Sequence, residues 1–205
     1  MAIRMMACTV CHGPQGRATQ AGYFPRIAGK PAGYLFNQLV HFRDGRRHHA
    51  AMVDLVQHMS DAYLRDIAAH FAALDLPYAA APPAGASAAV LVAGRHLVEQ
   101  GDAARNLPPC TACHGPRMTG ALPAIPGLVG LPRDYLLAQL GAWRHGERRA
   151  ALPDCMAQVA QRLRPDEVEA VTLWLATQPT QGDMKPVPAT ALPQPLPMRC
   201  GDLGP

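Results

Sequence analysis

The sequence contains an internal repeat with a period of about 100 residues, and this repeat constrains the fold more than any other feature. The pattern C-x-x-C-H occurs at residues 8–12 and again at residues 110–114. Downstream, residues 24–45 align with residues 125–146, with identical Pro, Gly, Pro, Tyr, Gln, Leu, Arg and Gly at matched positions. A period this long indicates two homologous domains rather than a solenoid, and 205 residues suffice for two small domains.

Each C-x-x-C-H motif has the spacing of a covalent haem c attachment site. Two cysteines three positions apart lie on one face of a helical turn, so both sulfur atoms reach the two vinyl groups of one porphyrin. The adjacent histidine then lies below the iron as its proximal ligand. A zinc site would need further paired Cys or His, and a redox dithiol would follow a strand of a βαβ unit; neither pattern is evident. The sequence therefore predicts two covalently bound haems c (iron), attached through Cys8, Cys11, Cys110 and Cys113, with His12 and His114 as iron ligands.

The sequence predicts an all-α protein. Apolar residues at helical spacing predict helices over residues 34–42, 61–74, 87–100, 135–143 and 165–177. Ser60 is a candidate N-cap for the second of these helices, and Pro165 suits the first turn of the last one.

The repeat and the composition together predict the domain boundaries. We expect a first domain over residues 1–76, a Pro/Ala-rich linker over 77–87 and a second domain over 88–178. Residues 179–205 are rich in proline and aperiodic, which predicts an irregular tail draped over the domains. Each half is short for an independent core, and a covalently attached haem supplies much of the missing apolar centre.

The repeat also selects candidates for the sixth ligand of each iron. Met156 lies seven residues before Leu163, and Met52 lies seven residues before Met59, in both cases just ahead of the last helix of the domain. Leu163 cannot bind iron, so its counterpart Met59 is better explained as a packing residue. We therefore predict Met52 and Met156 as the sixth ligands.

Two other ligand sets remain open. Five histidines of the first half offer a bis-histidine site, although none has a histidine counterpart in the repeat and we expect each at the surface: His41, His48, His49, His58 and His70. Cys155 precedes Met156 and offers a thiolate, whereas its counterpart Ala51 carries no sulfur. Cys155 and Cys200 form either a disulfide bond, as suits an oxidising compartment, or two free thiols.

With these residues placed, the chain resembles the two-haem bacterial cytochromes c of the cytochrome c4 family over roughly residues 7 to 177. The resemblance rests on the paired C-x-x-C-H motifs, the P-x-[IL]-x-G loops, the Y-L-x-x-Q-L segments and one methionine before each last helix. It implies two tandem class I cytochrome c domains with His–Met ligation and electron transfer between haems and to redox partners. It also implies that the carbonyls of Pro25 and Pro126 accept hydrogen bonds from the non-ligating nitrogens of His12 and His114.

The start and the end of the chain depart from that family pattern. Family members begin with an export signal and a helix, whereas Cys8 follows Met1 almost at once. We expect a periplasmic protein whose sequence is truncated at its start, and a first domain less stable than the second. The Pro-rich tail that contains Cys200 is a second departure, which we connect with a partner not shared by the whole family.

The charge of the chain limits the class of partner. A formal net charge of +4 without a basic-aromatic pattern argues against nucleic-acid binding. No apolar stretch approaches the roughly 18 residues of a membrane span, although peripheral membrane association stays open. Two arginine clusters occupy equivalent positions of the repeat and are candidates for solvated loops, haem propionate contacts or docking of an acidic partner: Arg43, Arg46 and Arg47, with Arg144, Arg148 and Arg149.

These features predict an electron carrier rather than an enzyme. We expect it to pass single electrons from a quinol-oxidising complex or a dehydrogenase to a terminal oxidase or another cytochrome. One alternative is a dedicated cytochrome c subunit of an alcohol- or sugar-type dehydrogenase. A second alternative is a haem enzyme, a peroxidase or a thiosulfate-oxidising enzyme, which requires a labile sixth ligand.

Overall fold

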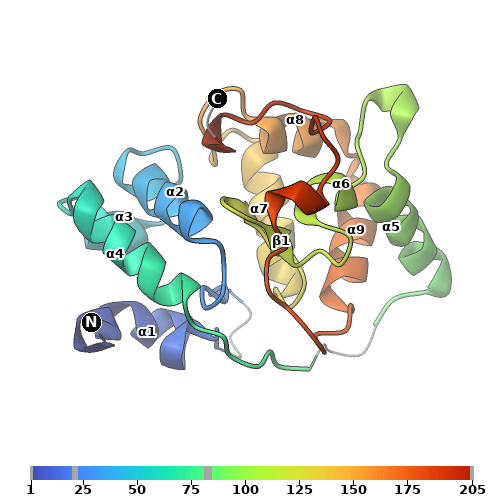
Figure 1. Ribbon diagram of the computed structural model, residues 1–205. Helices are drawn as coiled ribbons and strands as arrows, with labels where there is room; N and C mark the ends of the chain where they lie inside the picture. The colour runs from blue at the N-terminus through green and yellow to red at the C-terminus, as the bar shows by residue number, and fades with distance from the viewer. Residues whose placement is uncertain (1, 20–22, 81–84, 204–205) are drawn as a thin grey trace.

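The computed structural model describes residues 2–19, 23–80 and 85–203. Its helices form two groups that lie side by side, and the segment that follows the first group runs along one edge of the molecule (Figure 1). The first group contains α1 (Met6–His12), α2 (Ala32–Arg43), α3 (Ala50–Val56) and α4 (Asp61–Ala72), with the short 3-10 helices η1 (Ala2–Met5) and η2 (Pro14–Gly16).

The second group repeats this order and adds a helix in front. Its elements are α5 (Ala88–Gln100), η3 (Ala103–Arg105), α6 (Thr111–His114), α7 (Arg133–Arg144), α8 (Cys155–Arg162) and α9 (Pro165–Ala176). The all-α prediction is confirmed. We call the group α1–α4 the first domain and the group α5–α9 the second domain; the boundaries at 76, 88 and 178 remain predictions.

The last helix of each domain begins where the sequence predicts. Ser60 Oγ accepts a hydrogen bond from the Tyr63 amide at 3.3 Å, which satisfies one of the unpaired amides of the first turn of α4. Pro165 occupies the first turn of α9, where its missing N–H costs nothing. The short helices α3 and α8 were not predicted, because seven or eight residues are too few to establish a helical period.

A small antiparallel ladder interrupts the helical pattern. Strand β1 (Gly120–Ala121) pairs with β2 (Ile125–Pro126) in the second domain. Val187 of the tail joins this ladder: its amide donates to the Gly120 carbonyl, and its carbonyl accepts from the Leu122 amide, both at 2.9 Å. The ladder was not predicted from sequence, because two residues per strand carry no alternation. It fixes the loop that carries Pro126.

Each domain has its own apolar core. In the second domain Gly94 of α5 contacts the backbone of Ala170 in α9 so closely that a Cβ at residue 94 would lie 2.2 Å from the Ala170 carbonyl oxygen. In the first domain the side chain of Met5 fills part of the core, where it is fully buried against α2 and α4 residues. No helix among the described residues is long and apolar enough to cross a membrane.

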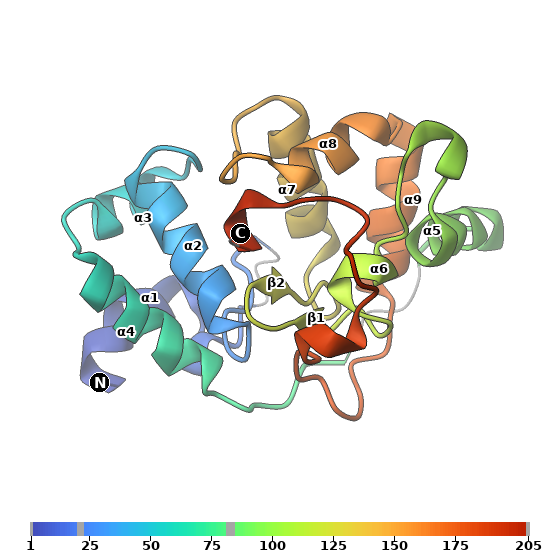
Figure 2. The ribbon, with the colours of Figure 1, turned by 45° about the horizontal axis from the view of Figure 1, so that its top comes forward.

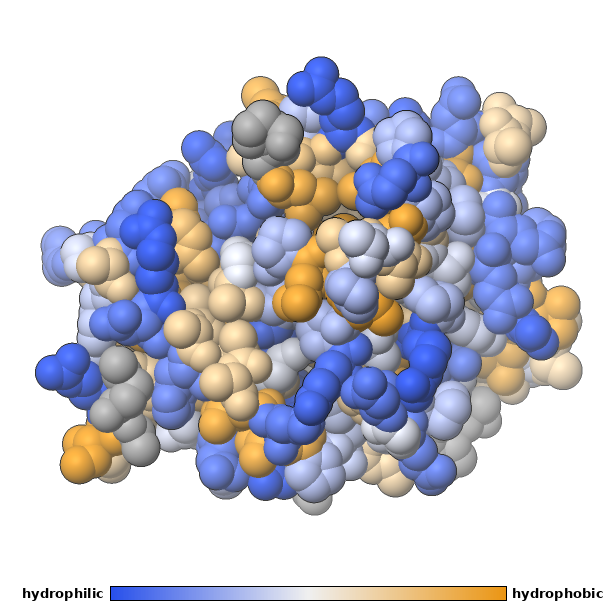
Figure 3. Space-filling model, in the orientation of Figure 1, coloured by the Kyte–Doolittle hydropathy of each residue, from blue (hydrophilic) through white to orange (hydrophobic). Residues whose placement is uncertain are grey.

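The tail crosses from the second domain to the first. It contains η4 (Ala189–Ala191) and η5 (Gly201–Leu203), and Figure 2 shows its end lying between α2 and the second domain. Leu192 packs with Ala121 and Ile125 in a small third core beneath the tail. On this side of the molecule hydrophobic side chains lie in patches near the middle of the face, among hydrophilic ones (Figure 3).

Candidate functional site: a cavity between two C-x-x-C-H motifs

The two histidines of the motifs occupy equivalent positions at helix ends. His12 ends α1 and His114 ends α6, and both side chains are buried. The Nδ1 atom of His12 lies 2.9 Å from the Pro25 carbonyl oxygen, and the Nδ1 atom of His114 lies 2.7 Å from that of Pro126. With Nδ1 as the donor, Nε2 of each ring carries no proton and has a lone pair for a metal.

Burial sets the protonation of these motif side chains. It lowers the pKa of His12 and of His114 below the ordinary histidine value, although the proline carbonyls act in the opposite direction. Both rings are thereby favoured in the neutral form that ligates metals. Burial also raises the pKa of the Cys110 thiol to about 12 and that of the Cys8 and Cys113 thiols above the usual range.

The predicted methionines face the same space as the histidines. A cavity of about 610 Å³ is lined by residues of both domains, including both histidines, the four motif cysteines, Met52 and Met156. Met52 lies in α3 and Met156 in α8, each in the helix that precedes the last helix of its domain. Met59 and Leu163 also line the cavity, and each belongs to the apolar core of its domain.

The surface assignment of His41 was wrong. His41 is 3% exposed, and its Nε2 lies 3.2 Å from Oδ1 of Asp202 in the tail. Burial alone would raise the pKa of Asp202, but the hydrogen bonds from His41 and from the Ala151 amide outweigh it and hold that pKa below its usual range. His48 and His58 are exposed as expected, and His49 and His70 are half-buried.

Two arginines of the predicted clusters meet at the domain boundary. Arg47 donates to the side chains of Gln38, Tyr135 and Gln139 at 2.8–3.0 Å, and Arg148 donates to Gln139 and Gln38 at 2.7 and 2.8 Å. Each guanidinium therefore reaches into the opposite domain. Among the described residues, no carboxylate lies within ion-pairing distance of either one, although both line the cavity.

The other four arginines of the clusters make contacts of other kinds. Arg43 pairs with Asp44 and Asp61, and Arg144 donates to the Leu163 carbonyl. Arg149 donates to the Gly45 carbonyl at 3.2 Å, and Arg46 is exposed. The equivalent sequence positions thus serve different purposes: Arg47 of the first cluster lines the cavity between the domains, and so do Arg148 and Arg149 of the second.

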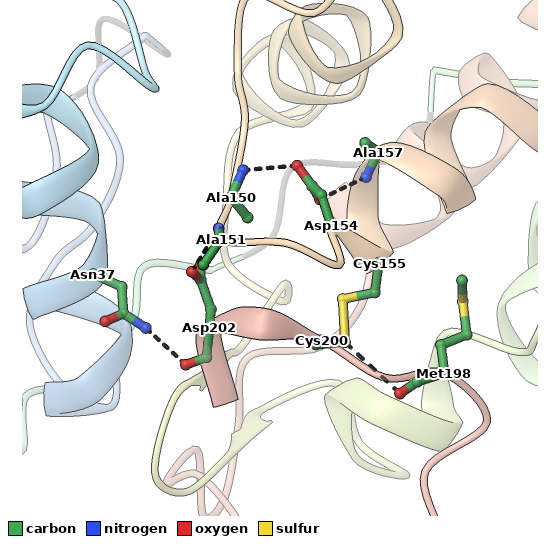
Figure 4. The surroundings of a disulfide bond; sticks show 9 residues. All are labelled: Asn37, Ala150, Ala151, Asp154, Cys155, Ala157, Met198, Cys200 and Asp202. Atoms are coloured by element: carbon green, nitrogen blue, oxygen red, sulfur yellow. Dashed lines mark hydrogen bonds between the residues drawn. A yellow bond between two sulfur atoms is a disulfide. The ribbon is translucent and has the colours of Figure 1, made fainter. Parts of the chain in front are cut away.

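Cys155 and Cys200 form a disulfide bond that joins the tail to α8 (Figure 4). The alternative of two free thiols is therefore wrong, and Cys155 offers no thiolate to a metal in this state. Beside the disulfide, Asn37 of α2 donates to the Asp202 carbonyl at 2.9 Å and the Ala151 amide donates to Asp202 Oδ1 at 3.0 Å. Sequence reasoning missed Asp202 and Met198, which also line the cavity; Cys200 was the only signal that this part of the tail is fixed.

The residues around the cavity fit two haem groups. Its lining is mostly apolar and includes His12 and His114 together with four methionines, and imidazole nitrogens and thioethers are axial ligands of haem iron: Met52, Met59, Met156 and Met198. The guanidiniums of Arg47 and Arg148 suit the anionic propionates of haem. The buried Nε1–H of Trp143 has no acceptor among the described residues and lines the cavity, as expected of a donor to a bound group.

Comparisons with known proteins agree with this arrangement. No family model matches the chain. A protein of Stutzerimonas stutzeri named thiosulfate dehydrogenase electron acceptor is 40% identical over 171 residues, which cover 83% of this chain and 78% of that protein. The cytochrome c4 of Pseudomonas aeruginosa is 32% identical over 170 residues, which cover 82% of each.

Solved structures show the same fold. The thiosulfate dehydrogenase (TsdBA) of Marichromatium purpuratum superposes with a TM-score of 0.74 at 36% identity, over 84% of this chain and 36% of that one. The reduced recombinant cytochrome c4 of Pseudomonas stutzeri superposes with a TM-score of 0.71 at 29% identity, over 84% of this chain and 94% of that one.

The fold and the two motifs define a di-haem c-type cytochrome, an electron-transport protein with two covalently bound haems c. The sequence identity to known cytochromes c4, over most of the length of both chains, shows that this chain belongs to the cytochrome c4 family. The predicted fold class, family and cofactors are confirmed by these relationships.

Proposed function

We propose that this di-haem carrier accepts electrons from a thiosulfate-oxidising dehydrogenase and passes them to a further redox protein in the periplasm. The observation that carries this proposal is the order of similarity. Two relatives named thiosulfate dehydrogenase electron acceptor are 40% and 37% identical to the chain, against 32% for the cytochrome c4 of Pseudomonas aeruginosa. The disulfide of the tail supports an oxidising compartment.

This proposal refines the predicted partners. It selects a dehydrogenase over a quinol-oxidising complex as the donor, and it replaces the alcohol- or sugar-type dehydrogenase with one of inorganic sulfur. The chain itself would then be a carrier, with the oxidation of thiosulfate left to its partner.

In the proposed haem sites, His12 and Met52 would hold the first iron, and His114 and Met156 would hold the second. The haems supply one-electron exchange between ferric and ferrous iron. The motif cysteines fix each porphyrin, and the Pro25 and Pro126 carbonyls hold the histidine rings in one orientation and tautomer. The apolar lining excludes water from both sites.

Arg47, Arg148 and Trp143 complete the proposed sites. Each offers N–H donors toward the cavity, and the two guanidiniums lack a carboxylate partner among residues 2–19, 23–80 and 85–203. We assign them to the propionates, whose charge would compensate these cations. Since each arginine contacts the opposite domain, propionate binding would also tie the domains together.

The axial ligands are tested on the holoprotein, expressed with an export signal in a host that matures c-type cytochromes. M52A and M156A are each expected to lose the low-spin spectrum of one haem and to bind carbon monoxide there, while M59A, with another methionine lining the cavity, keeps both. Unchanged spectra in M52A and M156A would refute the methionine assignment. Carbon monoxide binding by the wild type would instead favour a haem enzyme with a labile ligand.

The partner is tested by rapid mixing with a thiosulfate dehydrogenase and thiosulfate. Haem reduction that depends on both components is expected, and cytochrome without dehydrogenase is the control. Failure to reduce under these conditions, with both haems low-spin, would refute the proposed donor.

A further inference from the structure

Lys30 is a buried cation at the contact between the domains. Lys30 lies just before α2 in the first domain and is 4% exposed. The ammonium Nζ donates a hydrogen bond of 2.7 Å to the carbonyl oxygen of Gly127, a residue of the second domain. The adjacent Gly33 amide donates to the Pro123 carbonyl at 3.2 Å, so this loop of the first domain is held against the loop that contains β2.

No anion compensates this charge within the described part of the chain. None of the ion pairs among those residues includes Lys30, and its bonded partner is a backbone carbonyl. Burial, reinforced by the nearby Arg26 cation, lowers the pKa of Lys30 to about 7. An uncompensated buried ammonium is costly for folding, so an apolar side chain would serve packing alone better.

The position of Lys30 relates it to the second haem site. Gly127 directly follows Pro126, whose carbonyl accepts the hydrogen bond from Nδ1 of His114 at 2.7 Å. Lys30 also lines the cavity, and its charge contributes to the lowered pKa of His114. A positive charge in a site shielded from water favours the ferrous over the ferric state, because reduction removes one unit of positive charge from the iron.

The repeat does not reproduce this arrangement around the first haem site. The counterpart of Lys30 is Leu131, which is buried and uncharged. The counterpart of Gly127 is Arg26, whose guanidinium instead bonds the Leu76 and Pro77 carbonyls and stacks on the ring of Tyr78 at 3.8 Å. The second site therefore has the Lys30 ammonium at the Gly127 carbonyl, whereas the first has the Arg26 guanidinium directly after Pro25.

We propose that Lys30 of the first domain is a positioning residue that raises the reduction potential of the second haem across the domain boundary. The inference rests on the proposed His114–Met156 site. It implies that the cation increases the electron occupancy of the second haem at a given potential.

The test is a spectroelectrochemical titration of the wild type and of Lys30 variants, all as full-chain holoproteins at pH 6, where the ammonium form predominates. The haems are told apart by the NMR resonances of their axial methionines, assigned with M52A and M156A. In K30M and K30Q the equilibrium constant for reduction of the second haem is expected to be about tenfold smaller, which lowers its reduction potential by about 59 mV. The potential of the first haem is expected to stay unchanged.

Two further variants separate charge from packing. K30R keeps a cation and is expected to keep the wild-type potentials, and L131M is a conservative change at the counterpart position and is expected to shift neither. Equal potentials in K30M and wild type, or equal shifts in K30R and K30M, would overturn the inference. Neither of those results would affect the carrier proposal, which fails only if two low-spin haems are absent or no electrons arrive from the dehydrogenase.

Discussion

The two domains share the residues that would hold haem but differ in the elements that pack against the last helix of each domain. In the second domain α5 packs along α9, and Gly94 allows the two helices to touch at Ala170. In the first domain, the residue of α4 equivalent to Ala170 is Asp66, which is exposed. The comparison teaches that the repeat keeps the motif cysteines, histidines, prolines and methionines that line the cavity, whereas the elements packed on the last helix differ between the domains.

The tail widens this difference. It adds a hydrogen-bonded bridge to β1 and a disulfide to α8, both in the second domain, and reaches the first domain through Asp202. Helix α5, the tail at β1 and the disulfide to α8 therefore all support the second domain. None of the three has a counterpart among the described residues of the first domain.

The largest expected effect comes from removing the disulfide. The bond closes a sequence separation of 45 residues, so the double variant C155A/C200A is expected to lose about 2–4 kcal/mol of unfolding free energy. Denaturation of the holoprotein measures the loss, and amide hydrogen exchange locates it. Faster exchange in α8 and α9 with unchanged exchange in α4 is expected; equal changes in both domains would contradict the one-sided support described above.

The contact between α5 and α9 gives the next largest effect. In G94A the added Cβ meets backbone rather than a movable side chain, so the helices must separate, at a cost of about 1–3 kcal/mol. The control is G141A in α7, where nothing lies within 4 Å of the new Cβ and a gain of about 0.5–1 kcal/mol is expected. Equal thermal stability of the two variants would show that α5 does not brace the second domain.

The link between the tail and the first domain should depend on acidity. Because the pKa of Asp202 is held below its usual value of about 3.9, its carboxylate stabilises the folded state at neutral pH. That contribution, about 1–2 kcal/mol, is lost as the pH falls below that value and through the lower folded pKa. D202N is expected to expose the tail to proteolysis at pH 6 and to remove the acid dependence; protection equal to wild type would contradict the link.

The smallest expected difference concerns how the last helices begin. S60A removes the side-chain cap of α4 and is expected to cost about 1 kcal/mol. R164A at the matching position of α9 should cost less unfolding free energy. The Arg164 backbone amide donates a hydrogen bond of 2.8 Å to the Glu167 side chain, and this bond survives the substitution. Unfolding midpoints of both variants provide the measurement, and a larger loss in R164A would reverse the comparison.

Much of the site could be predicted because the repeat presents each ligand twice. A lone methionine carries little information, but Met52 and Met156 occupy matching positions of the repeat, so each supports the assignment of the other. The structure places both at the cavity that His12 and His114 line. The long helices were predictable for a similar reason, since twelve or more residues suffice to display a period.

The features that were missed break the repeat or join distant segments. His41 was assigned to the surface because it has no histidine counterpart in the repeat; its partner Asp202 lies 161 positions further along the chain. Lys30 aligns with a leucine, so the repeat suggested no role for it. Contacts of this kind depend on how the domains and the tail come together, which local periodicity does not encode.

The disulfide of the tail has a consequence for how the protein is assembled in the cell. Thioether bonds to haem form from free thiols, so Cys8, Cys11, Cys110 and Cys113 must stay reduced until the porphyrins arrive, whereas Cys155 and Cys200 must be oxidised. The tail also lines the cavity that the porphyrins enter. We therefore expect biogenesis to follow a fixed order, in which both haems are inserted first and oxidative folding then seals the tail over them.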